Sequence, residues 1–238
     1  TRLIWTESPG SVTMEVQDVP AIVAAAHERG IPVVLDTTWS AGVLFDAFSH
    51  GVDLTVQALT KYAGGHSDLL LGSVTVRDDG LWQRLGEAHK VLGYGVSPDD
   101  CSLALRGLQT LAVRLDYIER SALEIARRLA ARPEIERVLH PALPSCPGHE
   151  YWERDFTGSS GVFSIVFTRE WTRERIDAFI DALEFFEVGY SWAGTTSLAV
   201  PYSIHNPQRP AYGDRLVRLN VGLERTDDLI ADIERALQ

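Results

Sequence analysis

One lysine, Lys61, lies at the predicted end of a strand, where its amine could act as a nucleophile. Lys61 follows an apolar run that predicts a buried strand, has a hydroxyl neighbour in Thr60, and precedes the turn at Gly64 and Gly65. An amine becomes a nucleophile near neutral pH only where loss of solvent or a nearby positive charge lowers its pKa. The mouth of a sheet can provide that environment. The alternative is a solvated surface lysine, the usual state of this residue type.

Asp36 strengthens the catalytic interpretation. It ends the preceding predicted strand, so its side chain and that of Lys61 would project from the same edge of a parallel sheet. The pair suits pyridoxal phosphate, whose aldehyde would form a Schiff base with Lys61 and whose ring nitrogen would be kept protonated by Asp36. The alternative is a turn or helix-capping role for Asp36, and spacing alone does not separate the two.

Strands and helices in alternation must position these two residues. Four apolar stretches predict short strands: residues 3–5, 31–35, 54–57 and 69–76. Asp18, followed by Pro20, predicts a helix start, and Gly30 predicts its end. This order predicts an α/β fold with a mostly parallel sheet and flanking helices, whose ligands bind beyond the carboxyl ends of the strands.

The second half predicts a smaller α+β unit. Residues 102–131 repeat apolar residues at helical spacing, which predicts one long helix, kinked or broken along its length. The later predicted elements are a strand at 162–167, a helix at 172–186, a short strand near 188–190, a strand at 216–221 and a helix at 227–237. A loop containing Pro201, Pro207 and Pro210 is expected between the last two strands. The domain boundary is expected within or near the long helix.

Composition excludes several classes of function. The net charge is -11 and no basic block occurs, which argues against nucleic acid and anionic membranes as partners. No apolar run approaches the roughly 20 residues of a membrane span, and no secretory signal is evident. Cys101 and Cys146 are expected to be reduced cytoplasmic thiols, and the histidines show no metal-binding spacing. Because Thr1 opens a predicted strand, we expect a chain cut from a longer one.

Seven short motifs in order, spanning essentially the whole chain, resemble the cysteine and methionine metabolism family of pyridoxal phosphate enzymes, a fold-type I group. The motifs are Asp36-Thr37-Thr38, Gln57 to Tyr62 with Gly65 to Asp68, Arg106 to Leu111, His140 to Pro144, Arg154 to Gly161, Tyr190-Ser191-Trp192 and Arg218 to Glu224. The Gln-Ala before Thr-Lys, the run from 154 to 161 and the Tyr-Ser-Trp motif are similar to the carbon–sulfur β-lyase branch.

The resemblance implies a role for each matching residue. Lys61 would bind the cofactor covalently and later move the Cα proton of the substrate. Thr60 would hydrogen-bond the cofactor phosphate. Arg218 would hold the substrate α-carboxylate with two parallel hydrogen bonds, which suits a planar, permanently charged guanidinium. Ser191 and Trp192 would complete the carboxylate pocket.

The resemblance also implies an organisation and a reaction. Residues 1–108 would form the C-terminal portion of a large cofactor-binding domain, and residues 109–238 a small C-terminal α+β domain. A preceding part with a phosphate loop and a tyrosine stacked on the cofactor is expected, as is a homotetramer built from dimers. The substrate would be a small sulfur amino acid, cystathionine, cleaved to homocysteine, pyruvate and ammonia. The alternatives are γ-synthase, γ-lyase or sulfhydrylase chemistry, or an inactive fragment.

Two departures from the family pattern bear on the site. Ala58 stands where many members have a phosphate-binding serine, which removes one expected phosphate contact. After Trp192 the family has two glycines and then an aromatic or acidic residue, whereas this chain has Ala193, Gly194 and Thr195. This difference is expected to alter the pocket around the distal part of the substrate.

Overall fold

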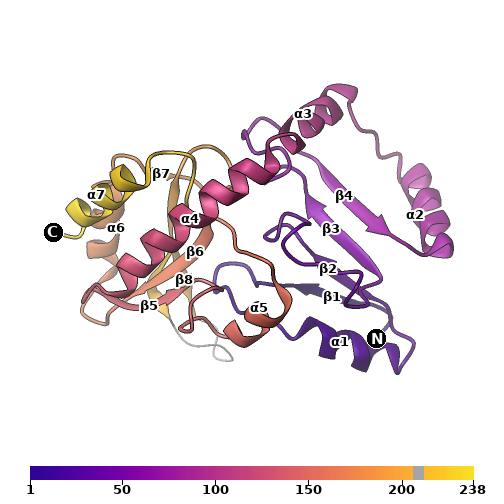
Figure 1. The fold of residues 1–238 in the computed structure, drawn as a ribbon, viewed down its shortest axis with the longest axis horizontal. Coiled ribbons are helices and arrows are strands. Elements are labelled where there is room, and N and C mark those ends of the chain that lie inside the picture. Colours follow the sequence, from indigo (N-terminus) through magenta and orange to yellow (C-terminus); the bar gives the residue numbers. More distant parts are fainter. Residues whose placement is uncertain (206–211) are drawn as a thin grey trace.

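The computed structural model describes residues 1–205 and 212–238, which it arranges around two separate sheets (Figure 1). The first sheet contains, in spatial order, β1 (Ile4–Glu7), β2 (Val33–Asp36), β3 (Leu54–Ala58) and β4 (Gly72–Val76). β1, β2 and β3 run parallel, and β4 pairs antiparallel with β3. The predicted α/β class with a mostly parallel sheet in the first half is confirmed.

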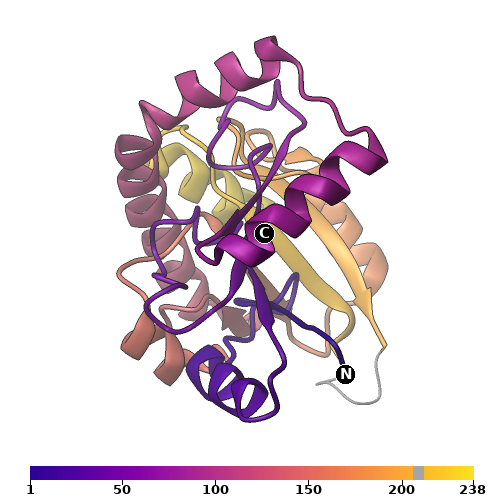
Figure 2. The ribbon, with the colours of Figure 1, turned by 90° about the vertical axis from the view of Figure 1, so that its right-hand side faces the viewer.

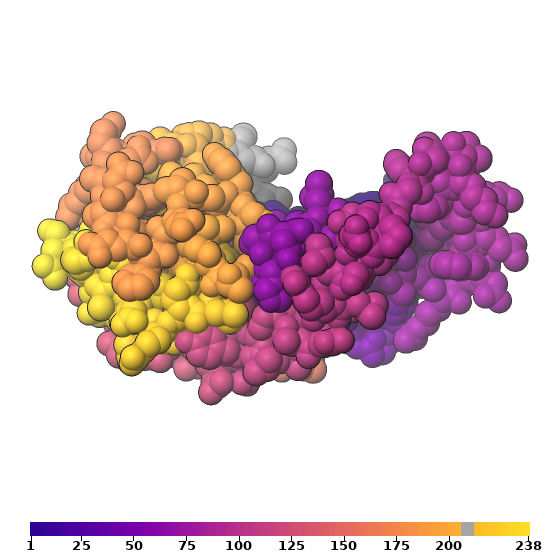
Figure 3. Space-filling view, turned by 90° about the horizontal axis from the view of Figure 1, so that it is seen from above, coloured from indigo at the N-terminus to yellow at the C-terminus, as the bar shows by residue number. Residues whose placement is uncertain are grey.

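Helices lie at both ends of the first sheet (Figures 1 and 2). α1 (Val19–His27) begins where the Asp18 carboxylate accepts the Ala21 N–H, as the capping pattern predicted. α2 (Asp79–Leu92) was not predicted, and none of its residues is buried. Together with α3 (Pro98–Leu108), α2 projects beyond the rest of the surface (Figure 3).

The predicted long helix is two helices, because α3 ends at Leu108 and α4 (Leu111–Ala130) begins three residues later. The break lies where the chain passes the segment that follows β3. A Cβ atom at Gly107 would come within 2.1 Å of the Ala63 carbonyl oxygen, so only glycine allows this approach. The helix therefore changes direction beside the Lys61 segment.

The second sheet is mainly antiparallel. Its strands, in spatial order, are β5 (Ile135–Leu139), β6 (Val162–Phe167), β9 (Gly213–Asn220), β8 (Leu198–Ile204) and β7 (Glu187–Val188). β8 was predicted as part of a loop, and Pro201 lies within it. Since β7 pairs only with Leu198 and Ala199, β8 is an edge strand at Pro201, where a sheet tolerates proline. Pro207 and Pro210 lie outside the described residues.

The two faces of the second sheet have different partners. α4, α6 (Arg173–Asp181) and α7 (Thr226–Ala236) cover one face and bury a large apolar core against it (Figure 1). The other face packs on α5 (His149–Asp155) and on side chains of the first half, among them Met14 and Trp39. Successive β9 residues alternate between these faces, so Leu216, Arg218 and Asn220 point away from the helical layer.

Among the described residues, no helix is both long and apolar enough to cross a bilayer. We propose that the domain boundary lies between residues 108 and 109. The end of α3 at Leu108 and the packing of α4 against the second sheet support this division.

Candidate active site

Lys61 lies on a tight turn just beyond the carboxyl end of β3. Its N–H donates to the Ala58 carbonyl at 3.0 Å, and its own carbonyl accepts the Gly65 N–H at 2.7 Å. The side chain crosses toward the second half, where Nζ donates to Ser191 Oγ at 2.9 Å. The predicted lysine and one of its predicted neighbours are therefore in direct contact.

The surroundings of Lys61 favour the neutral amine. Burial of the side chain lowers the pKa of Lys61, and the positive charge of Arg218 lowers it further. Nζ lies 5.1 Å from the centroid of the Trp192 ring. The chain contains only two lysines, and Lys90, on α2, is exposed. Lys61 is thus the only lysine that combines partial burial with a cationic neighbour.

Arg218 sits inside the second sheet, between Ser164 of β6 and Val200 of β8. One of its terminal nitrogens donates to the Tyr190 carbonyl at 2.7 Å and to the Ser191 carbonyl at 3.2 Å. Burial lowers the pKa of this guanidinium. Its Nε is buried and has no acceptor within the described part of the chain. A carboxylate arriving there would satisfy a donor that the fold leaves unmatched.

Ser191 and Trp192 belong to a loop that β9 itself holds. The Ala193 N–H donates to Asn220 Oδ1 at 2.9 Å, and Asn220 lies two residues beyond Arg218 on the same face. Ala193 adopts the left-handed region with φ of 66°. One strand therefore places the guanidinium and also anchors the loop around it.

Gly194, which matches the second glycine of the family pattern, has a close neighbour in the first half. A Cβ atom at Gly194 would lie 2.3 Å from the Ser67 Oγ atom, so this loop packs closely on the segment that follows Lys61. A larger residue at this position would require the Ser67 side chain to move. Gly194 thus allows the loop to lie close to Ser67 beside the site.

Asp36 lies at the end of β2, level with Val56 of the neighbouring strand β3. Its Oδ1 accepts the Thr38 N–H at 2.8 Å, and the Thr38 hydroxyl accepts the Ala58 N–H at 2.9 Å. Asp36 and Lys61 thus emerge at the same sheet edge, as predicted. They make no hydrogen bond to each other within residues 1–205 and 212–238.

Thr60 is already engaged. Its hydroxyl donates to the Leu71 carbonyl at 3.2 Å and accepts the Leu71 N–H at 3.0 Å. These bonds tie the Lys61 turn to the segment that enters β4. The phosphate role of Thr60 stays a prediction, and it requires the hydroxyl proton to leave the Leu71 carbonyl.

Two residues beside the site had no role assigned from the sequence. Asn220 fixes the loop that carries Ser191, and Tyr62 packs edge-on against Trp192, with ring centroids 5.6 Å apart. The signal for Asn220 was its position two residues after Arg218 in an apolar strand, which places both side chains on one face. The signal for Tyr62 was its position next to the lysine.

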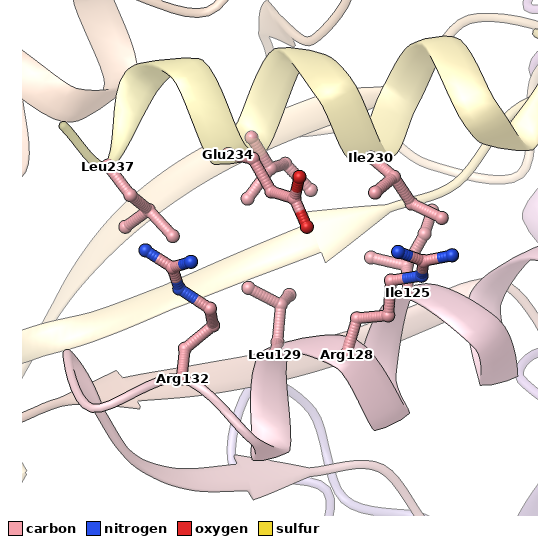
Figure 4. Close-up of a pocket in the computed structure, with 8 residues that line it drawn as sticks. Ile125, Arg128, Leu129, Arg132, Ile230, Glu234 and Leu237 are labelled. Atoms are coloured by element: carbon pink, nitrogen blue, oxygen red, sulfur yellow. The ribbon is translucent and has the colours of Figure 1, made fainter.

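The gap between α4 and α7 is not a competing ligand site (Figure 4). Its cavity volume is about 10 Å³, which holds no more than one water molecule. Arg128 and Arg132 line the gap and pair with Glu124 and Glu134.

The chain is similar to proteins of one enzyme family along its whole length. The family model described as Cys/Met metabolism PLP-dependent enzyme matches residues 1–238. Cystathionine β-lyase of Escherichia coli (strain K12) is 43% identical, with 98% of this chain and 61% of that protein covered. Cystathionine β-lyase of Haemophilus influenzae is 41% identical, with 100% of this chain and 62% of that protein covered.

Solved structures of enzymes of γ-chemistry are among those that match the chain. Cystathionine γ-synthase from Xanthomonas oryzae pv. oryzae, in complex with cystathionine, superposes with a TM-score of 0.93 at 32% identity. The alignment covers 99% of this chain and 62% of that structure, so the chain spans about three fifths of the length of its relatives. By its sequence and its fold, the chain belongs to the Cys/Met metabolism family of pyridoxal phosphate-dependent enzymes.

Proposed function

We propose that the protein is a pyridoxal phosphate-dependent carbon–sulfur β-lyase that cleaves cystathionine to homocysteine, pyruvate and ammonia. The observation that carries the proposal is the convergence of Lys61 from the first half with Ser191 and Arg218 from the second. The half-buried amine contacts the Ser191 hydroxyl, and the Arg218 guanidinium keeps one buried donor free. An amino-acid substrate needs both features, a base at Cα and a cation at the carboxylate.

The residues present fit the cofactor of the family. When bound, pyridoxal phosphate supplies an electron sink for the negative charge that develops at the substrate Cα. The Lys61 amine would hold its aldehyde carbon, and the Asp36 carboxylate, at the same sheet edge, would bind the ring nitrogen. Thr60 would contact the phosphate, whereas Ala58 offers no hydroxyl for it. The lowered pKa of Lys61 supports this assignment, because only the neutral amine attacks an aldehyde.

The chain's own residues then bind and deprotonate the substrate. Arg218 would hold the α-carboxylate through its free Nε, with Ser191 and Trp192 closing the pocket. Lys61 Nζ would take the proton from Cα, after which the thiolate of homocysteine leaves from Cβ. One water molecule completes the release of pyruvate and ammonia. The free donor on Arg218 fixes the carboxylate, and the proton transfer therefore occurs at a defined distance from the amine.

The decisive experiment is product identification with cystathionine. β-Elimination releases homocysteine and pyruvate, and mass spectrometry distinguishes this thiol from cysteine. Release of cysteine would contradict the β-lyase proposal and indicate γ-lyase chemistry. The match to a γ-synthase structure is the reason for testing this alternative. The same lysine and arginine serve both reactions, so only the product separates them.

A second experiment distinguishes an enzyme from an inactive fragment. The purified protein, supplied with pyridoxal phosphate, is expected to show a visible absorbance band that Lys61→Ala abolishes. Lys90→Ala is the matched control, because it removes the other lysine of the chain and should leave the band unchanged. A protein that stays colourless with added cofactor would support the fragment.

The assembly and location follow as parts of the proposal. We propose a cytoplasmic homotetramer built from dimers. Large apolar side chains that remain exposed in the first half, including Leu70, Trp82 and Val91, support association. Sedimentation equilibrium of the purified protein tests this, and a monomer at all concentrations would contradict it.

A further inference from the structure

Tyr62 follows Lys61 directly and has no part in the function proposed above. Its side chain is 0% exposed. It packs in a cluster that joins segments from both halves, namely Ala41, Leu111, Leu115, Ile118 and Ala193. The residue next to the candidate catalytic lysine thus lies at the junction of the two sheets.

The hydroxyl of Tyr62 is tied to the second sheet. It accepts the Gly161 N–H at 2.9 Å, immediately before β6 begins at Val162. A Cβ atom at Gly161 would lie 2.3 Å from Cγ2 of Ile118, so the glycine allows this strand end to approach. The motif from 154 to 161 therefore ends on a hydrogen bond to the neighbour of Lys61.

The ring of Tyr62 supports the indole beside the amine. Its edge meets Trp192 with centroids 5.6 Å apart and an interplanar angle of 64°. Lys61 Nζ lies 5.1 Å from the centroid of the same indole. Tyr62 contacts Trp192, and Trp192 lies beside Lys61 Nζ. A shift of the Tyr62 ring would therefore move the indole surface next to the amine.

The main chain of Tyr62 is held by a buried arginine. A terminal nitrogen of Arg114 donates to the carbonyls of Tyr62 and Gly107, both at 2.8 Å, and Nε donates to the Thr110 hydroxyl at 3.0 Å. The guanidinium fills the space beside Gly65, where a Cβ atom would lie 2.1 Å from it. Arg114 thus fastens the turn that carries Lys61 to the elbow between α3 and α4.

We propose that Tyr62 is a positioning residue for the Lys61 amine: its anchored hydroxyl, ring and carbonyl fix both the turn that carries Lys61 and the indole beside its Nζ. The inference rests on the proposed role of Lys61. An ordinary core tyrosine would contribute stability alone. The three anchors of Tyr62 instead end on Gly161, Trp192 and Arg114, which come from three different segments around the amine.

The test measures the reactivity of Lys61 without cofactor or turnover. The full chain is acetylated over a range of pH, and mass spectrometry reports the labelled fraction of Lys61, with Lys90 as the internal standard. In Tyr62→Leu we expect Lys61 to be labelled about two- to tenfold more slowly near pH 7, the size of an aromatic edge contact. Without the Tyr62 ring, the indole tilts and water reaches the Lys61 amine. The pH at which labelling of Lys61 is half-maximal therefore rises toward the value for Lys90.

Lost charge does not explain such a shift. Burial raises the pKa of Tyr62 to about 12, so the phenol is neutral over the labelling range. The charged group that faces the amine from the second sheet is Arg218, and every variant keeps it. Phe179→Leu is the control, because it truncates an equally buried aromatic residue on α6, away from Lys61.

Equal Lys61 labelling in Tyr62→Leu and Phe179→Leu would show that Tyr62 only fills the core. If Tyr62→Leu does not fold, Tyr62→Phe decides: loss of the hydroxyl anchor should slow labelling about twofold, and unchanged labelling overturns the inference. The wild-type protein separates this inference from the proposed function. A Lys61 that labels like Lys90 there contradicts the catalytic amine itself, whereas a difference that persists in the variants contradicts only the role of Tyr62.

Discussion

The two sheets deliver their residues to the site in different ways. The first sheet presents Lys61 from a turn beyond a strand end, held by hydrogen bonds from Leu71 and Arg114 to its neighbours. The second presents Arg218 from within a strand that has partners on both sides. The proposed base therefore lies on a hydrogen-bonded turn, whereas the proposed carboxylate-binding group lies within a central strand. The two proposed functional groups thus come from different halves and from different kinds of backbone structure.

The two halves also differ in how much of their apolar surface is buried. The second sheet buries a continuous apolar core under three helices. In the first half α2 buries no residue, and Trp82 is 66% exposed. Stability is therefore expected to reside mainly in the second half, and the following predictions test this division.

The largest expected effect is on turnover and comes from the first half. Lys61→Ala should lower the rate of thiol release at least about 10³-fold, since it removes the group that takes the Cα proton. The free energy of unfolding should change by less than about 1 kcal/mol. A thiol assay and a urea titration measure the two effects, with Lys90→Ala as the control. A large loss of stability would show that the turn is structural.

The next effect is on stability and comes from the second half. Phe167 is fully buried and stacks on Trp171, with ring centroids 4.4 Å apart. Phe167→Ala should lower the free energy of unfolding by about 3–5 kcal/mol. Trp82→Ala on α2 should change it by no more than about 0.5 kcal/mol. Similar losses in urea titrations of the two variants would remove the distinction between the halves.

Arg218→Lys tests the fixed clamp. An ammonium group cannot reproduce both the bonds to the loop carbonyls and the free Nε donor. We expect kcat/KM for cystathionine to fall about 10- to 100-fold, mainly through KM, which corresponds to the loss of one charge-assisted hydrogen bond. Arg169→Lys, at an exposed position in the same half, is the matched control. A changed kcat with an unchanged KM would assign Arg218 to the chemical step instead.

The smallest effect concerns acid stability of the second half. His140 is 0% exposed, its Nδ1 accepts the Ala142 N–H, and burial lowers its pKa to about 3 from 6.5. Between pH 6.5 and 3, His140 is protonated in the unfolded chain and neutral in the folded chain. The contribution of His140 to the free energy of unfolding is therefore complete above pH 6.5 and decreases as the pH falls toward 3. The contribution of His140 to the slope is at most about 1.4 kcal/mol per pH unit.

His140→Gln removes the titrating group and should flatten this part of the stability profile. His89→Gln, at an exposed position on α2, is the control and should leave the profile as it is. Chemical denaturation at a series of pH values between 4 and 7 measures the slope. An unchanged slope in His140→Gln would show that other groups govern acid unfolding.

The sequence predicted those parts of the fold in which local pattern and burial agree. The run at Val162–Phe167 is apolar at every position except Ser164 and forms a central strand. α2 was not predicted, although Leu81, Leu85 and Leu92 recur at helical spacing, and the structure buries none of its residues. β8 was not predicted because it contains Pro201, and proline argues against a strand except at a sheet edge. Pro201 lies at an edge only because β7 ends before it, and the sequence does not show where β7 ends.

The sequence suggested which residues could form the candidate site, and not how they contact one another. Strand ends placed Asp36 and Lys61 at one edge, because parallel neighbours end together. The contact between Lys61 and Ser191 joins residues from different sheets, and no local pattern encodes it. The engagement of Thr60 with Leu71 likewise depends on how β4 returns along β3.

The alternation along β9 links folding to function. Arg218 and Asn220 face the site, and Val217 and Leu219 face the helical layer. A deletion of one residue within this strand would exchange the two sets, placing a guanidinium in the apolar layer and leucine in the proposed substrate pocket. Such a slip would disrupt the apolar core and the candidate site together. In this strand, the register that buries Val217 and Leu219 in the core is the same register that places Arg218 at the candidate site.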